Sequence, residues 1–371
     1  MKKNIAVILG DGIGPEVTQQ AIKVLNAIAD IYGHEFVFKY GLMGAVAIEK
    51  TGEPLPDETV ELALESDAIL FGAIGDPKYD NDPYATVRPE QGLLKIRKVL
   101  QLYGNIRPIT IYPSLMHLSP LKESKIKDVD FVIFRELTSG IYFGNKHTSA
   151  DGLTASDECT YNTEEIERIA HLAFKHARKR RNKLTLVDKA NVLETSRLWR
   201  KTVQKLAHQY ADVQVNYLYA DNASMQLIQN PQQFDVILTD NMFGDILSFE
   251  ASIFNGTLGL VPSASVGNIT ALFEPIHGSY PQAAGKDIAN PIGSILSAAL
   301  MLDYFGLHEE ANKIREAVAW TLNNKFVTKD IDPINFYFTS TLGDLITEYV
   351  GNKISGDVNH ENIELRKSTV I

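Results

Sequence analysis

The sequence predicts an α/β fold in a globular chain of two or three domains. Short apolar runs alternate with helical patterns along most of the 371 residues, as in proteins that arrange strand–helix units around a sheet. Apolar residues make up 44% and charged residues 22% of the chain, which is the balance of a globular protein. The length corresponds to two or three domains of ~100–200 residues each, so the chain can bury a large core.

The first apolar run, Ile5–Leu9, predicts a buried strand. It is shorter than the apolar segment of a signal peptide, which needs about 7–15 residues, and Asp11 follows it closely. Pro15 suits the first turn of a helix that we expect to reach about Ala29. That helix has one apolar face, formed by Val17, Ala21, Val24, Leu25 and Ile28.

The later elements follow the same two patterns. We expect further buried strands at Ala68–Phe71, Phe131–Phe134, Leu184–Val187, Val213–Leu218 and Phe234–Leu238. We expect helices at Asp57–Leu64, from near Thr163 to the basic run 175–183, through Trp199, Val203, Leu206 and Tyr210, and at Ser294–Tyr304. Spacings of three and four residues are those of one helix face. The polar segment 351–371 predicts a loosely held end.

The charge of the chain excludes some classes of function. Its 36 Lys and Arg against 46 Asp and Glu give a net charge of −10, which argues against a whole chain that binds nucleic acid. The basic run 175–183 could form a patch that binds nucleic acid. We interpret it instead as a helix end, where cations complement the helix dipole. The single cysteine, Cys159, excludes an intramolecular disulfide and a cysteine-rich zinc site. No apolar run approaches the ~18 residues that span a bilayer, and we expect a cytoplasmic protein without membrane partners.

A glycine-rich turn lies between the first strand and the first helix. The segment Gly10-Asp11-Gly12-Ile13-Gly14-Pro15 has the context of a dinucleotide-binding fingerprint. That fingerprint needs a third glycine at the position of Pro15, where the helix packs closely on the strand. The lysine-containing phosphate loop of P-loop proteins is missing from the sequence as well. We therefore interpret the segment as a tight strand-to-helix turn.

Ionisable residues cluster near the ends of the predicted strands, where the functional groups of open α/β sheets gather. The set comprises Arg97, Arg107, Arg135, Tyr142, Lys189, Asp221 and Asp245. The arginines could bind a small polyanion bidentately, the aspartates are hard ligands suited to Mg²⁺ or Mn²⁺, and the lysine and tyrosine could transfer protons. The alternative is that the aspartates cap helices and the basic residues lie at the surface. Spacing alone does not decide whether these side chains converge.

Eight segments of the chain are distinctive. They are GDGIGPEV (10–17), RPEQGLLKIRK (88–98), NIRP (105–108), RELTSGIYFG (135–144), VDKANVL (187–193), DNMFGDILS (240–248), EPIHGS (274–279) and IANP (288–291). In this order they resemble the isocitrate/isopropylmalate dehydrogenase family, the metal-dependent β-decarboxylating dehydrogenases. The similarity runs from residue 5 to about 350.

The resemblance implies a fold and an assembly. The fold is the two-domain α/β fold of that family, not a Rossmann fold. One domain covers 1–102 plus 256–371, and the other covers 103–255 and carries a dimerisation arm. An obligate homodimer follows, in which each active site lies in a cleft and borrows Lys189 and Asp221 of the partner subunit.

The resemblance also implies an activity, the NAD-dependent oxidative decarboxylation of 3-isopropylmalate in leucine biosynthesis. Its residues have separate roles. The substrate carboxylates would be held by Arg97, Arg107 and Arg135, and Mg²⁺ or Mn²⁺ by Asp221 and Asp245. Lys189, helped by Asp221, would remove the hydroxyl proton, and Tyr142 would protonate the enolate that remains when CO₂ leaves.

Substrate choice would depend on one helix. Leu93 and Leu94 would offer an apolar wall to an isopropyl group, and Glu90 would repel an additional carboxylate. The alternative is that the two leucines belong to the core face of that helix. Two other activities stay open: a related enzyme that oxidises tartrate or D-malate, and a non-catalytic paralogue that regulates a partner subunit.

The cofactor contacts that the resemblance implies cover several loops. They are Ile13, Gly75, Asp76, Pro77, Glu274, His277, Gly278, Ser279, Tyr280, Pro281, Gln282, Ala283, Ala284, Gly285, Lys286, Asp287, Ile288, Ala289 and Asn290. Relatives that prefer NAD have an aspartate at the position of Gln282. Glutamine can still bond to a ribose hydroxyl, and we expect NAD as the cofactor.

A second departure concerns the metal. The family commonly has another aspartate four residues after Asp245, on the same helix face, where this chain has Phe249. Glu250 is the next residue, but it lies ~100° further round a helix. We therefore expect altered metal affinity or geometry.

Overall fold

The computed structural model describes residues 1–82 and 85–354 and divides the chain into two compact units. The first unit contains Met1–Ile96, Thr257–Ala264 and the chain from Thr270 onward. The second contains Arg97–Gly256 and Ser265–Ile269. None of the helices in the described part of the chain combines the length and apolar character needed to cross a membrane.

The first unit is built on a sheet with β2 (Glu35–Gly41), β1 (Lys2–Gly10), β3 (Ala68–Ala73), β12 (Ala271–Pro275) and the start of β11 (Pro262–Val266), in that order. β1 pairs in parallel with both β2 and β3, and β3 pairs in parallel with β12. All six residues of β3 are buried, which explains its continuous apolar sequence, since helices cover parallel strands on both faces.

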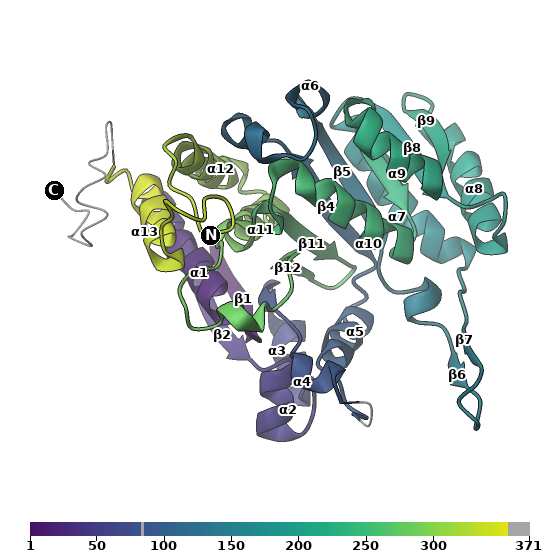
Figure 1. The fold of residues 1–371 in the computed structure, drawn as a ribbon, viewed down its shortest axis with the longest axis horizontal. Coiled ribbons are helices and arrows are strands. Elements are labelled where there is room, and N and C mark those ends of the chain that lie inside the picture. Colours follow the sequence, from purple (N-terminus) through teal and green to yellow (C-terminus); the bar gives the residue numbers. More distant parts are fainter. Residues whose placement is uncertain (83–84, 355–371) are drawn as a thin grey trace. The chain divides into compact units, whose positions relative to one another are not determined.

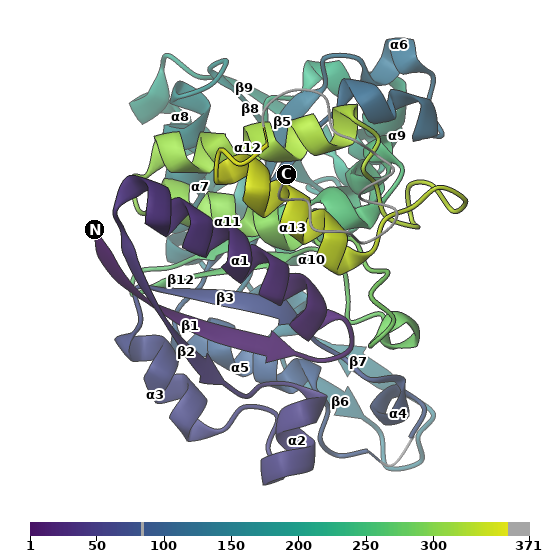
Figure 2. The same ribbon diagram turned by 90° about the vertical axis from the view of Figure 1, so that its left-hand side faces the viewer.

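Helices cover the two faces of this sheet (Figure 2). One face carries α1 (Gly14–Tyr32), α11 (Ile292–Tyr304), α12 (His308–Asn323) and α13 (Thr339–Val350), which pack on one another. The other carries α2 (Ala45–Thr51) and α3 (Asp57–Glu65). α11 is apolar almost all round because its neighbours enclose it.

The second unit has its own strands, β4 (Gly104–Thr110), β5 (Asp130–Glu136), β10 (Val236–Thr239), β8 (Lys183–Asp188) and β9 (Gln214–Tyr219), in that order (Figure 1). β4 is antiparallel to β5, and the remaining pairs are parallel. Phe134, Leu186 and Leu238 face a core that includes Phe174 of α7 (Thr163–Arg178) and Trp199 of α8 (Glu194–Ala207). Because side chains alternate along a strand, Arg135 and Thr239 face the opposite side.

That opposite side packs against α10 (Asn241–Ser252), which contacts β5 and α9 (Ala220–Gln229). A two-stranded ladder of β6 (Lys146–Thr148) and β7 (Ala155–Asp157) has only exposed residues. The helix that carries the predicted substrate residues is α5 (Glu90–Val99). The shorter helical segments are α4 (Pro77–Asp80), α6 (Glu123–Ile126) and 3₁₀ turns at Pro113–Leu118, Gly140–Tyr142, His208–Tyr210, Pro231–Gln233, Ile253–Asn255, Leu258–Leu260 and Pro281–Ala283.

The predicted elements are present, and several of their bounds differ by one to three residues. The strand expected from Phe234 begins at Val236, since Phe234 follows the turn Pro231–Gln233. The helix through Trp199 ends at Ala207, and Tyr210 lies in a 3₁₀ turn. Of the segment 351–371, residues 355–371 lie outside the described part.

The basic run 175–183 begins in α7, which ends at Arg178, as predicted. Beyond the helix, two arginines of the run bond to acceptors in the second unit. Arg180 Nε lies 2.8 Å from Asp235 Oδ1, and Arg180 Nη2 lies 2.7 Å from Asp130 Oδ2. Arg181 Nη2 donates to the carbonyl of Phe234 at 2.7 Å. The run therefore stabilises the second unit.

Candidate active site

The second unit gathers two buried arginines around one carboxylate. Arg107 comes from β4 and Arg135 from the end of β5, and both share a sheet face because Asn105 lies opposite Arg135 in the ladder. Asp245 of α10 accepts from both: its Oδ1 lies 3.3 Å from Arg107 Nη1 and also bonds Arg135 Nη1. The arginines are 6% and 3% exposed, so the cluster is rigid and largely desolvated.

Three uncharged side chains fix the directions of these arginines, and they lie in the distinctive segments 105–108 and 240–248 without a predicted role of their own. Asn105 Oδ1 accepts from Arg107 Nε at 2.7 Å, and Ser248 Oγ lies 2.6 Å from Arg107 Nη1. Asn241 Oδ1 accepts from Arg135 Nε at 3.0 Å and Nη2 at 2.7 Å. Each arginine is therefore held on one edge by a neutral group.

Three positive charges influence one another at Arg135. Burial lowers the pKa of Arg135, the charge of Arg107 lowers it further, and Arg97 acts in the same direction, while Asp245 opposes them. All three predicted arginines therefore act on one region, with one carboxylate between two of them. Such a region is suited to binding an anionic ligand, since charge-assisted bonds to guanidinium groups are strong.

Tyr142 belongs to the same cluster. Its ring centroid lies 5.7 Å from Arg135 Cζ. Burial raises the pKa of its hydroxyl, and the charge of Asp245 raises the pKa further, while Arg135 opposes this. The hydroxyl is therefore protonated at neutral pH and can donate a proton.

Lys189 and Asp221 form a second group in this unit. Lys189 directly follows β8, Asp221 lies in the first turn of α9, and Lys189 Nζ lies 2.8 Å from Asp221 Oδ1. The hydrogen bond from Lys189 lowers the pKa of Asp221. The Asp221 side chain is 68% exposed, so this pair can be reached from outside the chain.

Phe249 lies one helical turn after Asp245 on α10, and its ring centroid is 5.9 Å from Arg107 Cζ. Glu250 does not replace a ligand there, because both of its oxygens accept from Ser224 Oγ, at 3.1 and 2.9 Å. Within the described residues, no three His, Cys, Asp or Glu side chains are grouped so that they could hold a metal. Mg²⁺ commonly uses one or two carboxylates together with substrate oxygens and water. Asp221 and Asp245 would supply that number of carboxylates, but within one chain they belong to separate groups of side chains.

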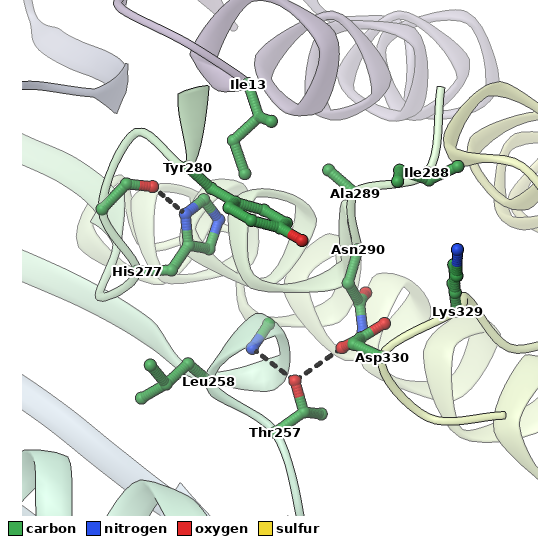
Figure 3. Close-up of a pocket in the computed structure, with 12 residues that line it drawn as sticks. Ile13, Thr257, Leu258, His277, Tyr280, Ile288, Ala289, Asn290, Lys329 and Asp330 are labelled. Carbon is green, nitrogen blue, oxygen red and sulfur yellow. Dashed lines mark hydrogen bonds between the residues drawn. The ribbon is translucent and has the colours of Figure 1, made fainter. Parts of the chain in front are cut away.

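The first unit contains a cavity of about 540 Å³ (Figure 3), which is within the usual size of ligand sites. It is lined by seven of the predicted cofactor residues, Ile13, His277, Gly278, Tyr280, Ile288, Ala289 and Asn290, and by five others, Thr257, Leu258, Gly259, Lys329 and Asp330. Asp330 Oδ2 accepts from Thr257 Oγ1 at 2.5 Å and from Asn290 Nδ2 at 3.1 Å, which fixes this wall. Thr257 and Asp330 were not predicted, since neither follows a predicted strand nor lies in one of the eight distinctive segments.

His277 provides a direct test of whether a cofactor fits. Its Nδ1 lies 2.9 Å from the carbonyl of Gly278 and donates to it, which leaves Nε2 as an acceptor. Burial lowers the pKa of His277, so the ring is neutral. Nε2 is buried and has no hydrogen-bond partner among the described residues. A bound molecule with an amino group, such as an adenine ring, would satisfy it.

The other predicted cofactor residues have different surroundings. Ala283 packs with Ile13 and Val17 in the core. Asp287 holds the start of α13, because its carboxylate accepts from Ser340 N at 2.8 Å and Ser340 Oγ at 2.6 Å. Glu274 is buried at the end of β12. The exposed positions are Gln282, Ala284, Gly285 and Lys286, and the partly buried ones are Gly75, Asp76, Pro77 and Pro281.

Comparison with known proteins places this geometry in a family. The sequence model of the isocitrate/isopropylmalate dehydrogenases matches residues 4–346. The chain belongs to the isocitrate/isopropylmalate dehydrogenase family. A 3-isopropylmalate dehydrogenase of Bacteroides fragilis is 48% identical over 94% of this chain and 99% of its own length. Another, from Aquifex aeolicus, is 53% identical over 89% of this chain and 92% of its own.

Solved structures of the family agree. An isocitrate dehydrogenase from Methylococcus capsulatus has a TM-score of 0.85 at 34% identity, covering 94% of this chain and 99% of that one. A β-decarboxylating dehydrogenase from Thermococcus kodakarensis has a TM-score of 0.78 at 36% identity, covering 96% and 99%. The predicted α/β fold of the isocitrate/isopropylmalate dehydrogenases, in place of a Rossmann fold, is confirmed. This member of the family is an oxidoreductase.

Proposed function

We propose that the chain catalyses the NAD-dependent oxidative decarboxylation of (2R,3S)-3-isopropylmalate to 4-methyl-2-oxopentanoate and CO₂ in leucine biosynthesis. One observation carries the proposal: Arg107, Arg135 and Tyr142 converge on Asp245 in a chain whose relatives at about 50% identity are named 3-isopropylmalate dehydrogenase. The cluster supplies what a dicarboxylate substrate needs, two or more guanidinium groups and a proton donor. The proposed site of action is the cytoplasm.

The arginines hold the two carboxylates of the substrate. α5 supplies the part that distinguishes substrates, because Glu90, Leu93, Leu94 and Arg97 are three or four residues apart and share a helix face. The two leucines are only partly buried, which leaves apolar surface for an isopropyl group. Glu90 is exposed on the same face and disfavours a substrate with a third carboxylate.

Two residues move the protons. Lys189, paired with Asp221, takes the proton of the substrate hydroxyl as that carbon is oxidised. Tyr142 returns a proton to the carbon that loses CO₂, which its raised pKa suits. Bound NAD would supply the hydride acceptor, and Asp221 and Asp245 would hold a divalent cation, which would supply positive charge to the substrate oxygen.

The cofactor binds at the cavity of the first unit in this proposal. Support comes from the seven predicted residues that line the cavity and from the unsatisfied Nε2 of His277. The proposed domains are 1–102 plus 256–371 on the cofactor side and 103–255 on the other.

The active enzyme is a homodimer in this proposal, and each site takes Lys189 and Asp221 of the partner subunit. Support comes from exposed apolar residues on α9, on α10 and just beyond it, which are Met225, Ile228, Ile246, Phe249 and Ile253, each 41–58% exposed. Their spacings of three and four residues place them on one face of each helix, and such a surface is typical of an interface. Phe249 joins this surface to the arginine cluster through its contact with Arg107.

An assay of the purified protein tests the activity. The protein is incubated with NAD, Mn²⁺ and 3-isopropylmalate, D-malate or tartrate in turn, and NADH absorbance and CO₂ are measured. We expect both products with 3-isopropylmalate, and kcat/KM at least ~10-fold above the other acids, since one apolar group in a pocket contributes that much. A higher kcat/KM for D-malate or tartrate would show that this acid, and not 3-isopropylmalate, is the substrate. No NADH with any acid would favour the non-catalytic paralogue.

A further inference from the structure

The glycine-rich turn after β1 has a role that its sequence did not reveal. Gly10 and Gly12 both have positive φ, at 70° and 58°. A Cβ atom on Gly10 would lie 1.9 Å from the carbonyl oxygen of Ala73, and one on Gly12 would lie 2.0 Å from that of Ser279. The glycines therefore let the turn contact two other segments directly, the end of β3 and the loop after β12.

Asp11 lies at the centre of this contact, and its side chain is buried. Its Oδ2 accepts from the backbone N–H groups of Ala45 and Gly75, each at 2.9 Å, and its Oδ1 accepts from Val46 N–H at 3.0 Å. Gly44 leaves room for the carboxylate, since a Cβ there would lie 2.4 Å from Asp11 Oδ2. One carboxylate thus joins three segments: the glycine-rich turn, the start of α2 and the loop after β3.

Two of these three segments were predicted to contact the cofactor. Ile13 lines the cavity, and its N–H donates to the carbonyl of Ser279 at 2.8 Å. A Cβ on Gly75 would lie 3.0 Å from Glu90 Oε1 and 3.6 Å from Ser279 Oγ. Gly75 therefore lies between the cofactor loop and the helix with the substrate residues. The position of Gly75 depends on the hydrogen bond that Asp11 accepts from it.

We propose that Asp11 is a positioning residue for the cofactor site, which holds Ile13 and the loop Gly75–Pro77 at the spacing that the dinucleotide requires. This inference rests on the proposed cofactor site. Asp11 acts through backbone groups alone, so it takes no part in the chemical step. Charge-assisted bonds to N–H groups are short and directional, which suits a carboxylate to fixing loops.

The test is Asp11→Asn with the intact protein. Because both oxygens accept from N–H groups, the amide nitrogen of asparagine faces a donor in either orientation, and at least one bond is lost. We expect the Kd and KM for NAD to rise about 10-fold or more, since small displacements in a site have large effects. We expect kcat at saturating NAD and the KM for 3-isopropylmalate to change less than about threefold.

Asp67→Asn is the matched control. Asp67 Oδ2 also accepts from a backbone N–H, that of Asn4 at 2.8 Å, but it lies at the other ends of β1 and β3. The Asp67→Asn substitution should lower thermal stability without changing the KM for NAD. If Asp11→Asn does not fold, Asp11→Glu, which displaces the carboxylate by one methylene, is compared in the same way.

The outcomes separate the inference from the proposed function. Wild-type protein that binds no NAD in direct titration contradicts the proposed function. Wild-type protein that binds NAD, with an unchanged Kd in the Asp11 variant, overturns the role of Asp11. A loss of NAD affinity that is equal in the Asp67 variant would also overturn it, because the effect would then reflect general destabilisation.

Discussion

Asp240 lies near Arg135, and like Glu136 it is a weaker acid than usual because it is buried. Its side chain caps α10 by accepting from Phe243 N–H at 2.9 Å. Burial raises its pKa to about 6, and the charges of Glu136 and Asp188 add to the rise, while the Phe243 N–H and Arg135 oppose it. The folded protein therefore holds this proton more tightly than the unfolded chain, where the pKa is near 3.8.

This difference gives a pH dependence with a definite sign. The contribution of Asp240 to stability is complete below about pH 4 and is lost as the pH rises through about 6. Asp240→Asn keeps an oxygen to cap α10 but cannot ionise. We measure the melting temperature of the variant minus that of the wild type at each pH. We expect this difference to be roughly 5 °C larger at pH 7 than at pH 4. An equal difference at both pH values would show that Asp240 is not responsible.

We expect Phe249 to limit how strongly the free protein holds a metal. With Asp221 and Asp245 as the proposed ligands, Phe249→Asp would add a carboxylate one helical turn from Asp245. We expect Mn²⁺ to bind on the order of 10-fold more tightly to the variant, because affinity follows the number of charged ligands. Calorimetric titration of Mn²⁺ without substrate measures this. Phe249→Asn, which adds no charge, is the control, and an unchanged Kd in Phe249→Asp would exclude the position from the metal site.

At the level of elements, α10 places the carboxylate against the arginines only because Gly244 leaves space. A Cβ on Gly244 would lie 2.7 Å from both Cβ and Cγ of Arg135. Gly244→Ala should therefore displace α10 or Arg135 and raise the KM for 3-isopropylmalate about 10-fold, with the Kd for NAD unchanged.

Gly259→Ala provides the reciprocal control in the other unit. A Cβ there would lie 2.6 Å from Cβ of Asn290, which lines the cavity. This variant should raise the KM for NAD and leave the KM for 3-isopropylmalate unchanged. If each variant raised the KM for NAD and the KM for 3-isopropylmalate equally, this would contradict separate roles for α10 and the cavity wall.

Sequence periodicity predicted the elements that are buried on a simple pattern, such as β3 and α1. It missed β4, because Asn105, Arg107 and Pro108 interrupt any apolar alternation. A proline in a sequence pattern argues against a strand, but β4 contains Pro108. It also missed β2, whose residues are mostly partly buried or exposed.

The site was predictable to a similar extent. The charged residues could be named because resemblance to a family fixed them, and the structure brings Arg107, Arg135, Tyr142 and Asp245 together. The roles of Asn241 and Ser248 could not be predicted, although both lie in the distinctive segment 240–248, since neutral residues in a helix give no signal until the arginines that they hold are placed. The role of Asp11 depends on Ala45 and Gly75, which are distant in sequence and are joined only by the fold.

The central claim concerns the molecule as a whole. It is that two copies of the chain complete each active site. Within one chain, Lys189 and Asp221 form one group and the arginines with Asp245 and Tyr142 form another. The exposed apolar residues of α9 and α10 lie on the same unit as both groups. We propose that association through that surface brings the first group of one copy to the second group of the other.

Complementation between two inactive variants tests this claim directly. Lys189→Ala and Tyr142→Phe are each expected to lower kcat by about 10²–10⁴-fold, because each removes a proton-transfer group. In a mixed dimer with shared sites, one site has both substitutions and the other has neither. Co-expression in equal amounts should therefore restore roughly a quarter of wild-type activity, since half of randomly paired dimers are mixed. Co-expressed protein that is no more active than the separate variants would contradict the shared site.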